Sequence, residues 1–213
     1  MGCLKFISSM VSSIFMTIVI LILLFPCGGL NLINNTIYGF FNPPEKILKI
    51  NAQKIADFSG IPARYELTKS VDMFGIKTAA AQDKKTKQTM AIVNTGWVLN
   101  VTKQDIKSNE IISKFDDLSK NLDMLKKQNI KLDQLQIIKK GSFVAFGQDI
   151  PYIKANFKLS DDKNKNIEGI IGVVTKPDAK NDLVISYSEP GKYNQKLAEN
   201  FFRHVKYRSI GND

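Results

Sequence analysis

An uncharged, strongly apolar stretch near the N-terminus is the feature that most limits how this 213-residue chain can fold. Lys5 is the only charged residue before Glu45, and residues 6–25 are interrupted only by serine and threonine. A helix needs about 20 apolar residues to cross a bilayer, and hydroxyl side chains can bond back to the helix backbone. A buried helix of a water-soluble domain would instead carry charges on one face. The sequence therefore predicts a transmembrane helix within residues 1–30.

This segment is either an uncleaved single-pass anchor or a cleaved signal peptide, and we favour the anchor. Cleavage after Gly29 stays open because Cys27 and Gly29 are small residues two positions apart, although no Ala-x-Ala pattern is present. Lipidation of Cys27 is disfavoured because Pro26 precedes it. Myristoylation of Gly2 is disfavoured because Phe6 occupies the position that needs serine or threonine.

The charges that flank the segment set its expected orientation. Lys5 is the only basic residue close to either end, so the positive-inside rule places the N-terminus in the cytoplasm and the body outside it. Residues 31–44 form an uncharged, asparagine-rich linker that contains Tyr38, Phe40 and Phe41. These aromatic rings suit either the membrane–water interface or packing against the following domain.

Residues 45–213 form a single predicted domain of the α+β class. Helical periodicity appears at both ends and in the middle, and alternation typical of strands fills the rest. The sequence predicts an antiparallel β-sheet packed between helices, an α/β/α sandwich. The expected helices cover residues 45–58, a stretch from 102 to 125, and 193–205; the expected strands cover 64–82 as a pair, 88–95, 135–138, 142–146, 150–159, 167–175 and 183–188.

The helix expected after residue 101 has the clearest start signal. Thr102 and Asp105 have the spacing of a capping box, with aspartate in place of glutamate or glutamine. Apolar residues then recur every three or four positions, which predicts one buried stripe. The stripe consists of Ile111, Phe115, Leu118, Leu122 and Leu125.

The order of these elements, together with several short motifs, resembles the PsbP-like α/β/α sandwich domains, including small membrane-anchored bacterial versions. The resemblance spans about residues 46–207 and departs from the pattern at Ala63-Arg64, where a glycine would be expected. It implies a fold and an accessory or binding role without catalysis, and it assigns no site. The residues that carry it are Ala56-Asp57-Phe58, Ile61-Pro62, Tyr65, Met73-Phe74-Gly75-Ile76-Lys77, Gly147-Gln148, Gly169 and Phe201-Phe202.

Residues able to do chemistry are few. Both cysteines, Cys3 and Cys27, lie in or beside the apolar segment, so the body has neither a disulfide nor a thiol nucleophile. The single histidine, His204, is followed by basic residues and has no local carboxylate or nucleophile to act with. Gly169-x-x-Gly172 falls within a strand and is therefore no phosphate-binding loop.

Two acidic pairs are the only candidates for a metal site. Asp116-Asp117 falls on a helix, where adjacent residues point apart. Asp161-Asp162 begins a loop that lacks the glycine and glutamate of a calcium-binding loop and contains two lysines. We therefore expect no catalytic, cofactor-binding or metal-binding residues, and no cofactor.

The net charge of +10 favours acidic partners. Only Arg64, Arg203 and Arg208 among the 30 basic residues are arginines, and arginine is the residue that best recognises bases and phosphates. We expect no specific nucleic-acid binding. The expected partners are the membrane, with anionic lipid headgroups or a protein as the surface that the body meets.

The sequence predicts a membrane-anchored, non-catalytic accessory or binding domain outside the cytoplasm. Two alternatives stay open: a secreted soluble binding module released near Gly29, and an enzyme whose site is assembled from residues far apart in the chain.

Overall fold

A computed structural model describes residues 45–73, 76–95, 100–114, 131–160, 165–178 and 180–207. The predicted membrane segment, residues 1–30, and the predicted linker, residues 31–44, lie outside the described residues. Among the helices of the described part, none combines the length and the apolar character needed to cross a membrane.

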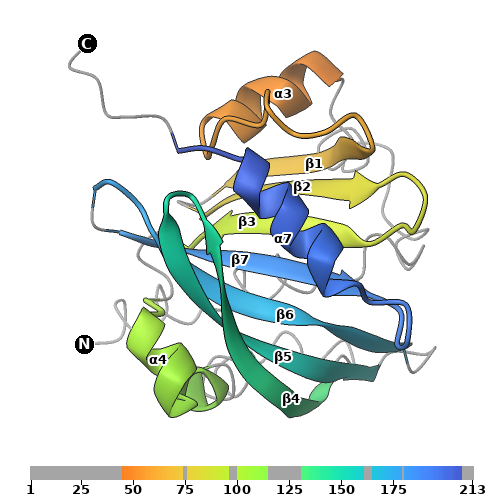
Figure 1. Ribbon diagram of the computed structural model, residues 1–213, viewed down its shortest axis with the longest axis vertical. Helices are drawn as coiled ribbons and strands as arrows, with labels where there is room; N and C mark the ends of the chain where they lie inside the picture. The colour runs from red at the N-terminus through yellow and green to blue at the C-terminus, as the bar shows by residue number, and fades with distance from the viewer. Residues whose placement is uncertain are drawn as a thin grey trace, which may run out of the picture.

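A seven-stranded antiparallel sheet dominates the described structure (Figure 1). Its strand order is β1-β2-β3-β7-β6-β5-β4, so two meanders meet where β3 pairs with β7. The central strands are buried along nearly their whole length, which explains why they are apolar without strict alternation. The strands are β1 (Tyr65–Met73), β2 (Ile76–Asp83), β3 (Thr89–Asn94), β4 (Lys131–Ala145), β5 (Gln148–Ser160), β6 (Lys165–Thr175) and β7 (Asn181–Ser188).

The edge strand β4 differs from its prediction. Residues 135–138 and 142–146 were expected to form two short strands, yet one continuous strand of 15 residues runs through both. Lys139 and Lys140 interrupt the apolar pattern between them, and an edge strand tolerates such lysines because one side faces solvent. The register shifts at residues 137–139, as a β-bulge allows.

Helix α7 (Gln195–His204) lies across one face of the sheet, and α3 (Glu45–Gln53) lies beside β1 at the edge of the sheet (Figure 1); both contribute to the main core. Helix α7 inserts Phe201 and Phe202, both fully buried, and α3 contributes Ala52. The Tyr65 ring meets the Phe201 ring edge-on at a centroid distance of 5.3 Å. The predicted C-terminal helix is thus confirmed, whereas the first helix ends earlier than residue 58.

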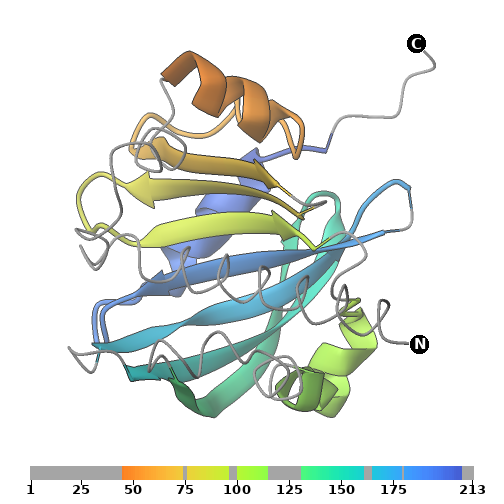
Figure 2. The same cartoon turned by 180° about the vertical axis from the view of Figure 1, so that it is seen from behind.

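Helix α4 (Lys103–Ser108) contacts β5 and β6 at the lower end of the sheet (Figure 2). The predicted capping box is confirmed: the Asp105 backbone N–H donates to Thr102 Oγ1, and the Thr102 N–H donates to the Asp105 carboxylate. The helix is interrupted at Asn109, which adopts a left-handed φ of 71°, and helical structure resumes at residues 110–114. Ile111 is buried, but the rest of the predicted stripe lies outside the described residues.

The prediction of an α/β/α sandwich is wrong. The described structure is mostly sheet, and its helices are short: α3, α4 and α7 have nine, six and ten residues, and residues 110–114 form a further helical stretch. Two physical effects separate the prediction from the structure. Strand β4 extends through Lys139 and Lys140, where the apolar alternation is broken, and the left-handed residue Asn109 interrupts the helix after six residues.

Candidate functional site

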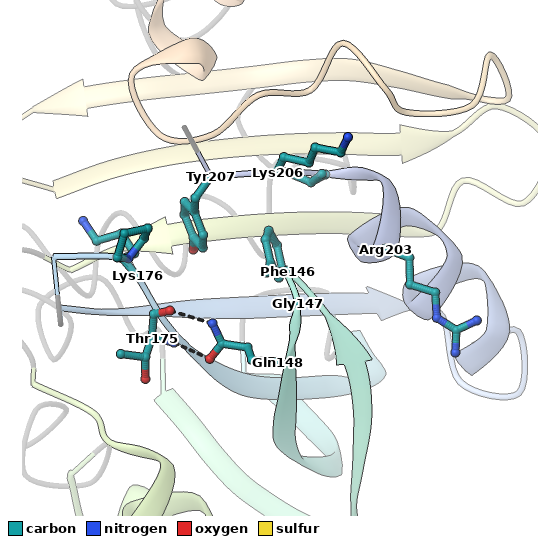
Figure 3. Close-up of a pocket in the computed structure, with 10 residues that line it drawn as sticks. Phe146, Gly147, Gln148, Thr175, Lys176, Arg203, Lys206 and Tyr207 are labelled. Carbon is teal, nitrogen blue, oxygen red and sulfur yellow. Dashed lines mark hydrogen bonds between the residues drawn. The ribbon is translucent and has the colours of Figure 1, made fainter. Parts of the chain in front are cut away.

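A cleft of about 520 Å³ opens beside the C-terminal end of α7 (Figure 3). Three segments that are distant in sequence form its walls: the β4–β5 turn, the β6–β7 connection, and the end of α7 with the residues that follow. The lining residues are Phe146, Gly147, Gln148, Thr175, Lys176, Pro177, Arg203, Val205, Lys206 and Tyr207.

The β4–β5 turn supplies the aromatic wall of the cleft. Ala145 pairs with Gln148, so Phe146 and Gly147 form a two-residue turn, and their φ values of 53° and 70° are both left-handed. Such turns match the twist of the strands they join, but a phenylalanine there is uncommon. The Phe146 ring stacks on the Tyr207 ring at a centroid distance of 4.9 Å, which compensates for the unfavourable backbone.

Gln148 connects the turn to the β6–β7 wall. Its side-chain amide donates to the Thr175 carbonyl at 2.6 Å and accepts from the Thr175 N–H at 3.1 Å (Figure 3). The Lys103 ammonium group donates to the same amide oxygen at 2.7 Å. Because both ends of the amide are paired, this wall is rigid and its polar groups are already used.

A buried carboxylate lies behind the cleft. Asp182 accepts a hydrogen bond from the Tyr207 hydroxyl at 2.9 Å through Oδ2, while its Oδ1 has no hydrogen-bond partner. The Lys176 ammonium group is 3.9 Å from Oδ1. Burial raises the pKa of Asp182 to about 6, although Lys176 and Tyr207 both act to lower it. Burial also raises the pKa of Tyr207, so this hydroxyl keeps its proton.

Three cationic side chains stand around the rim: Lys176, Arg203 and Lys206. Arg203 is exposed, and its Nη2 is 3.6 Å from Glu199 Oε2, a loose contact at the surface. Lys206 is exposed and has no ion pair with a described residue. Arg203 Nε also donates to the Val144 carbonyl at 3.3 Å, and the Lys176 ammonium group is 3.6 Å from Asp178 Oδ2, so Lys206 is the least engaged of the three cations. Together they give the rim a positive charge that suits an anionic group.

The lining residues do not form a catalytic arrangement. Thr175 Oγ1 donates to the side-chain oxygen of Asn181 at 3.0 Å, and an amide cannot take a proton from it. Tyr207 donates to Asp182 and is not free to act on a ligand. The described lining offers charge and aromatic contact to a ligand.

The residues singled out in the sequence lie elsewhere or outside the described structure. His204 is exposed at the end of α7, and its Nδ1 is 2.7 Å from the Asn200 carbonyl oxygen. Gly169 and Gly172 lie within β6, as predicted. Cys3, Cys27, Asp116-Asp117 and Asp161-Asp162 lie outside the described residues. Within the described ranges, no three His, Cys, Asp or Glu side chains are grouped to hold a metal ion.

Sequence reasoning missed the cleft because its walls come from three separate segments. One local signal was available: a phenylalanine–glycine pair between two apolar segments is compatible with a two-residue turn. The basic residues near His204 were noted in the sequence, but only the fold brings Lys176 next to them.

Comparison with known proteins adds no assignment: no protein-family model matches the chain, and no curated protein matches it. The resemblance to PsbP-like domains therefore stays a prediction.

Proposed function

We propose that this protein is a non-catalytic binding domain, tethered to a membrane through residues 1–30, whose cleft beside α7 takes an anionic ligand. The observation that carries the proposal is the rim of the cleft, where Lys176, Arg203 and Lys206 surround an opening backed by the Phe146–Tyr207 ring pair. Of the carboxylates next to the cleft, Asp182 is buried and engaged by Tyr207, and Asp178 Oδ2 is 3.6 Å from the Lys176 ammonium group.

Two further features support this proposal. The body from residue 45 onward has a net charge of +9, so an anion meets a favourable field on approach. The apolar segment before it is long enough to span a bilayer and has no charge between residues 6 and 25. We propose an orientation with the body outside the cytoplasm, in line with Lys5 at the N-terminal side.

Binding is tested by titrating the purified full chain, in detergent micelles, with inorganic phosphate. We expect saturable binding that weakens about tenfold in an Arg203→Gln/Lys206→Gln variant, since each charge-assisted contact is worth roughly 1 kcal/mol or more. The matched control is Lys84→Gln/Lys85→Gln, which removes two exposed charges at the β2–β3 turn and should bind as the unaltered chain does.

Equal weakening in the two variants would overturn the proposal, because it would show that phosphate responds to overall charge and not to the cleft. The tether is tested separately by carbonate extraction of membranes and by the mass of the mature N-terminus. A chain that is released by carbonate, or that begins after Gly29, contradicts the anchored form.

A further inference from the structure

The outward face of α3 exposes two large apolar side chains, where a surface helix is normally polar. Leu48 and Ala52 are buried against the sheet, and the Ser70 hydroxyl on β1 donates to the Leu48 carbonyl at 3.0 Å. On the opposite side, Ile47 and Ile50 are 47% and 48% exposed. These two isoleucines are three residues apart, so they are neighbours on one side of the helix.

Cationic side chains lie next to this apolar pair. Lys46 is four residues before Ile50 and therefore adjoins it on the helix surface, and Lys49 is three residues after Lys46. Both lysines are exposed, and among the described residues Lys49 pairs with the exposed Glu45, at 2.6 Å. Apolar side chains flanked by lysines are the pattern by which a helix lies flat in a membrane interface.

The position of α3 in the chain indicates which surface it meets. It begins at Glu45, and the apolar segment ends at residue 25, so the connecting chain reaches at most about 70 Å when fully extended. Among the described elements, α3 is the first that follows this segment. A tether of that length keeps the helix at high effective concentration near the bilayer, so even a weak contact is populated.

We propose that the outward face of α3 lies on the bilayer that holds the chain, with Ile47 and Ile50 among the headgroups and Lys46 and Lys49 paired with anionic lipid phosphates. This inference rests on the membrane tether of the proposed function and is independent of the cleft. It orients the body, since α3 lies beside β1 at one edge of the sheet, which would then face the bilayer (Figure 1).

The test is hydrogen exchange of the α3 backbone amides, residues 45–53, in the full chain. The chain is placed in detergent micelles, in phosphatidylcholine liposomes, and in phosphatidylcholine liposomes that contain phosphatidylglycerol. We expect exchange to slow by about fivefold in the anionic liposomes relative to micelles, and by less in phosphatidylcholine alone.

Two variants should remove that protection: Ile47→Ser/Ile50→Ser, and Lys46→Gln/Lys49→Gln, which keeps the apolar pair. The matched control is Ile138→Ser, which removes an equally exposed isoleucine from β4 and should leave α3 protected. All five positions are exposed, so folding should be unaffected.

Equal exchange in all three environments overturns the inference, and so does protection in micelles as strong as in anionic liposomes, which would mean that the chain itself covers α3. If α3 is unprotected while the chain resists carbonate extraction, the lipid contact fails and the tether stands. Release of the chain by carbonate contradicts the tether itself.

Discussion

The guanidinium group of Arg64, just before β1, donates a hydrogen bond from Nε to Asp83 Oδ2 at 2.6 Å, at the end of β2. The other carboxylate oxygen of Asp83 accepts from the backbone N–H groups of Lys85 and Thr86, at 3.1 and 2.7 Å, and from the Thr86 hydroxyl. A fully buried carboxylate thus closes the turn between β2 and β3.

These contacts give Asp83 a defined effect on acid stability. Burial alone would raise its pKa, but the bonds from Arg64 and Thr86 outweigh burial and lower the pKa from 3.8 to about 2. A lowered pKa adds stability above pH 3.8, which is lost as the pH falls toward 2. We expect Asp83→Asn to lower the free energy of unfolding at pH 7 by about 2 kcal/mol, measured by urea denaturation.

The same variant should also flatten the dependence of stability on pH between 4 and 2. Asp72→Asn serves as control, because its carboxylate contacts Lys54 at the surface, where such pairs contribute little. A loss of stability as large in the control would contradict the role given to Asp83.

Asp182 has the opposite effect on the pH dependence of stability, because its pKa is raised and not lowered. Burial raises its pKa to about 6, so the folded protein binds a proton more tightly than the unfolded chain does. The contribution of Asp182 to stability is therefore most favourable below pH 3.8, and it falls as the pH rises to 6. We expect Asp182→Asn to raise the free energy of unfolding above pH 6 by up to about 3 kcal/mol, seen in denaturation series at pH 5 and pH 8.

Tyr207→Phe is the complementary change at this pair. It removes the hydroxyl that donates to Asp182 and leaves a buried carboxylate with one bond fewer, so we expect a loss of about 1–3 kcal/mol at pH 8. If both variants destabilise at pH 8, the view of Asp182 as a costly buried charge is wrong.

Gly169 has no room for a side chain. A Cβ atom there would lie 2.3 Å from the Ser186 carbonyl oxygen on β7 and 2.9 Å from the Tyr187 Cβ. Relief requires the central strands to separate, so Gly169→Ala should cost more than about 2 kcal/mol by thermal or urea denaturation.

Gly191→Ala provides a comparison for Gly169. Its added Cβ would meet open space, but its φ of 74° is unfavourable for alanine, so we expect only about 1–2 kcal/mol. A smaller effect at Gly169 than at Gly191 would contradict the argument from close packing.

The capping box of α4 was predicted from the sequence alone, so a variant of it tests that prediction. Thr102→Ala removes the side-chain acceptor of the Asp105 N–H and should cost about 1 kcal/mol, a fall of about 2–4 °C in Tm. Ser113→Ala removes an exposed hydroxyl bonded to a carbonyl three residues earlier and should change Tm much less. Similar shifts in both would argue against a specific cap.

Local signals explain which elements were predicted correctly. The β1–β2 pair, β3, β5, β6 and β7 follow from β-branched and alternating residues, and α7 follows from its four-residue spacing of apolar side chains. The single continuous strand β4 was not predicted from local signals, because Lys139 and Lys140 break the apolar alternation. A strand tolerates these lysines only because it lies at the edge of the sheet.

By itself, the sequence determined the uncharged apolar segment of residues 6–25, the basic body, and the cap at Thr102, because each depends on neighbours in the chain. Only the tertiary structure decided the predominance of the sheet and the existence of the cleft. Phe146, Lys176 and Arg203 meet there because the β4–β5 turn, the β6–β7 connection and the end of α7 converge at one place. Burial of Asp182 is likewise a property of the packed molecule, since desolvation depends on what surrounds the carboxylate in space.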